Sequence, residues 1–137
     1  MIGISSKTVY AVAALQELGN IHTEKVLKIK EIASKANIPQ NFLEQILLEL
    51  KKQGLLLSTK GMYGGYRLAK DLKDITLKDI VLILESDAFS DVCKTDNEGL
   101  KLFWKEIKED ISSVFEVPLS ELKNYQLQSA KTLNYTI

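Results

Sequence analysis

Apolar residues recur every three or four positions over most of the chain, which is typical of amphipathic helices. The first such stretch follows Ser5 and Ser6, either of which can cap a helix. Its residues divide between two adjoining faces, one with Val9, Val12, Ala13 and Gln16 and the other with Ala11, Ala14, Leu15 and Leu18. Gly19 is expected to end this helix in the left-handed conformation that glycine adopts easily.

Two further helical stretches follow in close succession, over 27–36 and 39–53. Asn37-Ile38-Pro39 separates them, and Pro39 suits the first turn of the second helix, where its missing N–H costs nothing. In the second helix Leu43, Ile46, Leu47 and Leu50 form the apolar side, and Gly54 is expected to end it. Two helices joined by a turn of three or four residues form a helix-turn-helix.

The hydrophobic period changes after residue 54. Residues 55–59 are too short for a helix and predict a strand, residues 60–65 are a glycine-rich turn, and residues 66–68 can return as a second strand. Two strands around such a turn predict a β-hairpin. A hairpin directly after a helix-turn-helix is a wing.

The last third of the chain predicts helices separated by a polar loop. Thr76 and Asp79 resemble a capping box that opens a short helix, and residues 86–97 are polar and predict a loop. Asn97 can then cap a long helix, which Pro118 ends. A last short helix is expected around Leu119, Leu122 and Tyr125, with a frayed tail from residue 126 onward.

The charges are divided unevenly along the chain. The 137 residues carry 18 basic and 18 acidic side chains, and a net charge of zero by itself argues against a nucleic-acid partner. Residues 1–70, however, carry ten Lys and Arg against five Asp and Glu, a net of +5, whereas residues 71–137 carry eight against thirteen, a net of −5. The basic half contains both the helix-turn-helix and the hairpin, so it is the half expected to face DNA.

Composition excludes several classes of protein. The single Cys cannot form a disulfide within the chain or a Cys-rich zinc site. We find no apolar run long enough to span a bilayer and no signal peptide, so a cytoplasmic protein is expected. The chain has one His and no nucleophile–base pair, and its glycine-rich turn lacks the Lys-Ser/Thr ending of a phosphate-binding loop. No catalytic residues are therefore expected.

Three motifs resemble those of the Rrf2 family of bacterial winged-helix transcription regulators. They are Ser6-Lys7-x-x-Tyr10-Ala11-Val12, Leu43-Glu44-Gln45-Ile46 and Lys60-Gly61-x-x-Gly64-Gly65-Tyr66-x-Leu68. The resemblance covers residues 2 to about 125 and implies a fold that is mainly α with a small β-hairpin. It implies a winged helix-turn-helix DNA-binding domain over 1–85, an effector-type loop over 86–97, and a dimerisation helix with a C-terminal tail over 98–137.

We expect a dimeric, sequence-specific DNA-binding regulator that acts as a repressor on a pseudo-palindromic operator. Base contacts are expected from the start of the second helix of the pair, and phosphate or minor-groove contacts from the first helix and the wing. The candidates are Ser6, Lys7, Tyr10, Lys28, Gln40, Asn41, Glu44, Gln45, Lys51, Lys52, Lys60, Gly61, Met62, Tyr63, Gly64, Gly65 and Arg67. The alternative is a winged-helix protein–protein interaction module without DNA binding.

The long helix after the loop carries the strongest periodic pattern in the chain, and in the family this helix crosses its partner. A small winged domain can hardly cover so wide an aromatic stripe, so dimerisation is expected. The candidate interface residues are Leu100, Phe103, Trp104, Ile107, Ile111 and Phe115.

Cluster-binding relatives carry three Cys in the loop before the dimer helix, whereas this loop carries only Cys93. Bound cofactors are therefore not expected, and an iron–sulfur cluster is improbable with a single Cys. A site shared across a dimer would need carboxylates from Asp87, Asp91 or Asp96, which suit harder cations. Cys93 is expected to be silent, with a thiol switch or an intersubunit disulfide as alternatives.

Overall fold

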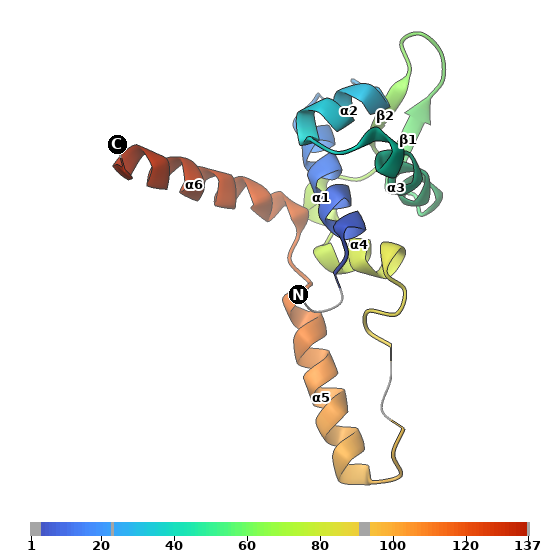
Figure 1. Cartoon of the computed structure of the whole chain (residues 1–137), viewed down its shortest axis with the longest axis vertical. Coiled ribbons are helices and arrows are strands. Elements are labelled where there is room, and N and C mark those ends of the chain that lie inside the picture. The colour runs from blue at the N-terminus through green and yellow to red at the C-terminus, as the bar shows by residue number, and fades with distance from the viewer. Residues whose placement is uncertain (1–3, 23, 91–93, 137) are drawn as a thin grey trace.

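The chain folds into a mostly helical body with one two-stranded antiparallel hairpin (Figure 1). The computed structural model describes residues 4–22, 24–90 and 94–136. In chain order the elements are α1 (Ser6–Gly19), α2 (Ile29–Ala36), α3 (Gln40–Lys52), β1 (Leu56–Thr59), β2 (Gly65–Leu68), α4 (Leu77–Leu84), α5 (Glu98–Val114) and α6 (Leu122–Thr136). Short 3-10 turns, Leu72–Asp74 and Leu119–Glu121, flank α4 and α5.

The core forms where α1 packs against α2, α3 and α4. On α1 the structure buries the face of Ala11, Ala14, Leu15 and Leu18, whereas Val9 on the adjoining face is exposed. On α3 the buried residues are the predicted Leu43, Ile46, Leu47 and Leu50. The predicted core side of α3 is therefore confirmed, and the structure decides between the two faces of α1.

The predicted helix over 27–36 begins two residues too early. Leu27 is instead bridged to Tyr66 of β2: the Leu27 N–H donates to the Tyr66 carbonyl at 2.9 Å, and the Tyr66 N–H donates to the Leu27 carbonyl at 2.8 Å. Tyr66 and Leu68 also pack against the core and so anchor the wing to it.

Gly19 does not end α1 in a left-handed conformation, contrary to the prediction. The helix does end with Gly19, but the φ of Gly19 is not positive, and Asn20, which caps the helix, has right-handed helical angles. Gly19 matters for space instead, because a Cβ there would collide with the Leu72 side chain. The left-handed positions are Asn37 (φ 54°), which ends α2, and Gly54 (φ 78°), which follows α3 as predicted.

The caps predicted for α4 and α5 are confirmed. Thr76 and Asp79 form a reciprocal capping box, with the Thr76 N–H donating to Asp79 at 2.9 Å and the Asp79 N–H donating to the Thr76 hydroxyl at 3.1 Å. The Asn97 side chain accepts from the Leu100 N–H at 3.1 Å at the start of α5. These local pairings can be read from sequence because both partners lie within one turn.

The tail predicted to fray from residue 126 is helical, since α6 extends to Thr136. No Gly or Pro follows Pro118, and Gln, Leu, Ala and Lys in this stretch are good helix formers. Figure 1 shows α5 and α6 leaving the body in different directions. The predicted domain limits at 85/86 and 97/98 stay a prediction.

Candidate nucleic-acid interface

The side of α3 opposite the core is exposed along its whole length. Its exposed residues are Gln40, Asn41, Phe42, Glu44, Gln45, Leu48, Lys51 and Lys52. The same helical period that buries the leucine row forces these side chains outward. Lys52 lies 3.8 Å from Glu49 in an exposed ion pair, which holds it only weakly. The second helix of the helix-turn-helix therefore presents a polar, C-terminally basic surface.

The start of α1 lies beside the start of α3. Ser6 and Lys7 are exposed, and the Tyr10 ring is half-buried against Phe42 of α3, with ring centroids 6.2 Å apart and planes tilted by 47°. Phe42 is 54 % exposed, and the sequence reasoning passed over it. The available signal was an apolar side chain on the otherwise polar side of α3.

A carboxylate from α4 holds the start of α1. Glu85 accepts hydrogen bonds from the Ser5 N–H and from the Thr8 hydroxyl, the latter at 2.8 Å. Burial by itself would raise the pKa of Glu85, but the hydrogen bonds from Ser5 and Thr8, with the nearby Lys7 charge, lower that pKa overall. The first turn of α1 contains no acidic residue of its own, so Glu85 supplies the negative charge that a helix N-terminus favours.

The tip of the wing is open to solvent. Met62 is 76 % exposed and Tyr63 is 89 % exposed, and Gly61 has a positive φ of 105° with free space around it. Lys60 at the base is also exposed, whereas Arg67 on β2 is partly buried. The tip therefore carries two large side chains on a turn that glycine makes possible.

Gly64 and Gly65, two of the candidate DNA-binding residues in the wing, also have a structural role. Gly64 is buried, and a Cβ there would overlap the backbone of Thr59 across the turn. A Cβ on Gly65 would overlap the backbone of Leu27. Both glycines allow close approach within the chain, closing the hairpin and docking it on the segment before α2.

Lys28 lies next to that docking point. Its side chain is exposed, and its backbone N–H donates to the Glu31 carboxylate at 3.0 Å at the start of α2. The candidate residues are thus spread over α1, α2, α3 and the hairpin. In Figure 1 the tip of the hairpin and α5 lie at opposite ends of the molecule.

The apolar stripe of α5 is uncovered in the single chain. None of the residues of α5 is buried, and Leu100, Phe103, Trp104 and Ile107 are exposed. Phe103 and Trp104 pack edge to face with ring centroids 5.1 Å apart. Ile111 and Phe115 are partly buried, and Phe115 packs edge to face on Phe89 at 5.4 Å.

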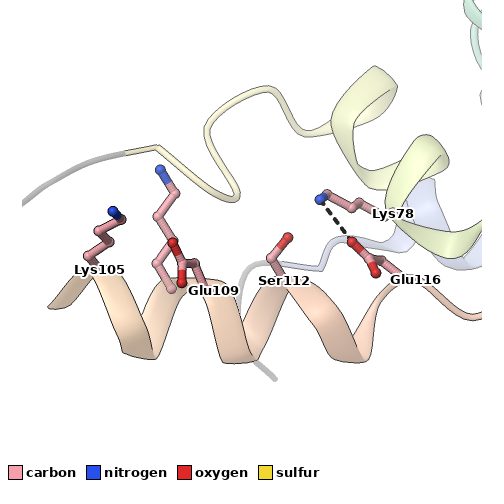
Figure 2. A pocket seen from close by; sticks show the side chains of 6 residues that line it. Lys78, Lys105, Glu109, Ser112 and Glu116 are labelled. Atoms are coloured by element: carbon pink, nitrogen blue, oxygen red, sulfur yellow. Dashed lines mark hydrogen bonds and ion pairs between the residues drawn. The ribbon is translucent and has the colours of Figure 1, made fainter. Parts of the chain in front are cut away.

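The other side of α5 is polar and lines an open cavity of about 510 Å³ next to α4 (Figure 2). Lys78 Nζ lies 3.4 Å from Glu116 Oε1 across this cavity, and the Lys78 N–H donates to the Phe115 carbonyl at 2.7 Å. The remaining lining residues are Lys105, Lys108, Glu109 and Ser112. The lysine and glutamate charges largely cancel here. The contacts of Lys78 with Glu116 and Phe115 join the start of α4 to the end of α5.

Cys93, for which a thiol switch is one alternative, lies outside the described residues, as does Asp91. Within the described ranges no group of three or more His, Cys, Asp and Glu side chains is placed to hold a metal ion. Over the same ranges none of the helices has the length and apolar character needed to cross a membrane.

A helix-turn-helix followed by a two-stranded wing defines the class of winged-helix DNA-binding proteins. Within that class the chain belongs to the Rrf2 family, described as iron-dependent transcriptional regulators, whose profile matches residues 4–128. It is therefore a DNA-binding transcriptional regulator and not an enzyme, which disfavours the protein–protein module considered above.

Individual relatives agree with this assignment. The chain is 31 % identical over 124 residues to the HTH-type transcriptional regulator CymR of Bacillus subtilis (strain 168), covering 89 % of this chain and 90 % of CymR. The solved structure of CymR, the global cysteine regulator of B. subtilis, superposes with a TM-score of 0.79 at 32 % identity, covering 91 % of this chain and 98 % of that one. The structure of T. potens IscR gives a TM-score of 0.72 at 30 % identity, covering 90 % and 87 %.

Proposed function

We propose that the chain is a homodimeric repressor that reads a pseudo-palindromic operator with α3 in the major groove and the wing in or near the minor groove. The observation that carries this proposal is the exposed, largely polar side of α3, set opposite a buried apolar row. A helix packed in this way stands out from the body as a ridge, which is the form that fits a major groove.

Gln45 and Glu44 are the proposed base-reading side chains. Both are exposed near the start of α3, the part of a recognition helix that reaches base edges. Gln can pair with adenine in bidentate fashion, and Glu can accept from the cytosine amino group. Gln40 and Asn41, in the first turn, lie within the same reach.

Phosphate contacts are proposed to flank this centre on several elements. Ser6, Lys7 and Tyr10 extend from α1, and Lys51 and Lys52 from the end of α3. The remaining proposed contacts are Lys28, Lys60, Arg67 and, from the wing, Gly61, Gly65, Met62 and Tyr63. Such contacts fix orientation and supply most of the salt-dependent affinity.

Dimerisation through α5 is supported by its uncovered aromatic stripe. An exposed row of Leu100, Phe103, Trp104 and Ile107 is costly for a monomer in water. A second copy related by a two-fold axis would cover the row and bring two copies of α3 to one operator. The polar side of α5 that lines the cavity would stay outside this interface, because it faces a different direction from the stripe.

Repression is proposed to act by occupancy. A dimer that covers an operator with two recognition helices and two wings would exclude other proteins from the promoter without further contacts. A protein with this role works where the bacterial chromosome lies, in the cytoplasm. Transcript levels near its binding sites should rise when the gene is deleted, and a fall would contradict repression.

We propose that the protein works without a bound cofactor, although the family is described as iron-dependent. Iron–sulfur clusters are held mainly by Cys thiolates, and the chain contains only Cys93. One Cys cannot supply the three thiolates that a three-Cys site in one subunit requires. Protein purified without oxygen should be colourless and free of iron, and a visible absorption band with stoichiometric iron would overturn this.

The experiment that tests the function is selection of random duplex DNA on the full-length protein, followed by gel shift of the selected site. Enrichment of one pseudo-palindrome with half-sites about one helical turn apart is expected. Recovery of no common sequence, or binding equal to that of a scrambled duplex at low salt, would refute sequence-specific recognition.

A further inference from the structure

The most unusual side chain on the proposed recognition surface is Phe42. Every other exposed residue in the first two turns of α3, from Gln40 to Gln45, is polar, yet the Phe42 ring is 54 % exposed. Phenylalanine has no hydrogen-bonding atom, so on this surface it can gain free energy only by apolar contact. Tyr10 packs against one part of the ring, and the exposed remainder is available for apolar contact with a partner.

Phe42 lies at the end of α3 that would face base edges in the proposed binding mode. It lies in the first turn of α3, three residues before Gln45, so the two side chains are neighbours on the helix surface. The ring of Tyr10 packs beside it with centroids 6.2 Å apart and backs it from α1. Phe42 thus lies between Gln45, the proposed adenine-reading side chain, and Tyr10, a proposed phosphate contact.

The major groove offers few apolar groups. On its floor, G, C and A present hydrogen-bond donors and acceptors, whereas thymine presents a C5-methyl group. We propose that Phe42 is a specificity-determining residue that contacts a thymine methyl group in each half-site, next to the base pair read by Gln45. This inference rests on the proposed mode of binding through α3.

The test uses the operator selected on the full-length protein, with each thymine replaced in turn by deoxyuridine, which lacks only the methyl group. Affinity is measured by fluorescence anisotropy at fixed salt. Loss of one buried methyl group should weaken wild-type binding about fourfold per half-site at one thymine position. The Phe42→Ala variant should bind more weakly and should no longer distinguish thymine from uracil there.

Two further variants separate this contact from a general loss of apolar surface. Phe42→Leu retains an apolar side chain and should keep a reduced methyl sensitivity. Leu82→Ala removes an exposed apolar side chain from α4, away from α3, and should keep the full wild-type sensitivity. Since Phe42 is half-exposed, Phe42→Ala should fold, and its circular dichroism and thermal midpoint are recorded as a check.

The outcomes distinguish this inference from the proposed function. If no operator is selected, sequence-specific recognition itself fails. If an operator is selected but no thymine methyl matters, or if Phe42→Ala keeps the wild-type methyl sensitivity, the role of Phe42 is wrong while the proposed function stands.

Discussion

At the scale of single residues, side chains from distant parts of the chain position the proposed DNA-binding groups. Glu85 lies at the end of α4, yet it holds Ser5 and Thr8 at the start of α1. The exposed Ser6 and Lys7 are adjacent to those anchored residues. The carboxylate therefore fixes the place from which α1 would reach a phosphate.

Glu85→Gln should lower the free energy of unfolding by about 1 kcal/mol at pH 7, since hydrogen bonds to a charged group and a charge at a helix N-terminus are both weakened. The pKa of Glu85 is lower in the folded chain than its ordinary value of 4.5, so this stabilisation is present above pH 4.5. It is lost as pH falls through the lower, folded-state pKa. Urea unfolding of both proteins at pH 7 and at acidic pH measures it.

The control for this prediction is Glu24→Gln, which removes an exposed carboxylate from a loop. Its stability should follow the wild-type dependence on pH. If Glu85→Gln unfolds like wild type at pH 7, the anchoring role assigned to Glu85 is wrong.

Gln45 is the residue on which base discrimination is expected to depend. Gln45→Ala should relax the preference at one base pair per half-site by about 1–3 kcal/mol and leave the other positions unchanged. Gln53→Ala is the matched control, because Gln53 is exposed at the opposite end of the same helix. Competition binding with single-base operator variants measures both. If Gln45→Ala keeps the wild-type base-pair preference, other residues of α3 read the base pairs.

At the scale of elements, the sequence predicts α3 more fully than it predicts the wing. The helix was predictable, because its alternation of buried and exposed residues follows a period of 3.6 that sequence displays directly. The wing was predictable only as a hairpin. Its tight closure at Gly64 and its docking on Leu27 depend on backbone contacts that no periodic pattern reports.

The basic end of α3 should supply affinity without sequence preference. Lys51→Ala with Lys52→Ala should weaken binding to all duplexes and flatten the plot of log affinity against log salt by about 0.9 for each phosphate contact removed. Lys123→Ala with Lys131→Ala removes the same charge from α6 and should leave the slope unchanged. A wild-type slope in the α3 double variant would show that these lysines do not contact phosphate.

At the scale of the whole molecule, α5 stands away from the body with its aromatic stripe uncovered (Figure 1). The basic half of the chain forms the helix-turn-helix and wing, and the acidic half forms the loop, α5 and α6. Phosphate would repel the acidic half and so orient a dimer with its basic faces on the duplex.

Trp104→Glu should convert the protein to a monomer at micromolar concentration. Losing one buried aromatic side chain from each of two subunits costs about 3 kcal/mol, which weakens association by about 100-fold. Lys105→Glu places the same carboxylate on the cavity side of α5 and should stay dimeric. Sedimentation equilibrium measures both. A Trp104→Glu protein that remains dimeric would place the interface elsewhere.

The sequence by itself determined the local structure of this protein. The core side of α3, the caps at Thr76 and Asn97, and the hairpin all depend on residues within a turn or two of one another. Local hydrogen bonds and hydrophobic period are fixed by spacing, so they can be read without a structure. The family motifs belong to the same category, since they are short and contiguous.

Only the tertiary structure decided which distant residues meet. The bridge from Leu27 to Tyr66, the anchoring of α1 by Glu85, and the pairing of Tyr10 with Phe42 each join segments that are far apart in sequence. Such contacts form because elements pack on a common core. The residues that meet in this way follow no periodic pattern in the sequence. Phe42 stands out in the sequence only as an apolar residue outside the buried row of α3, and its contact with Tyr10 depends on how α1 and α3 cross.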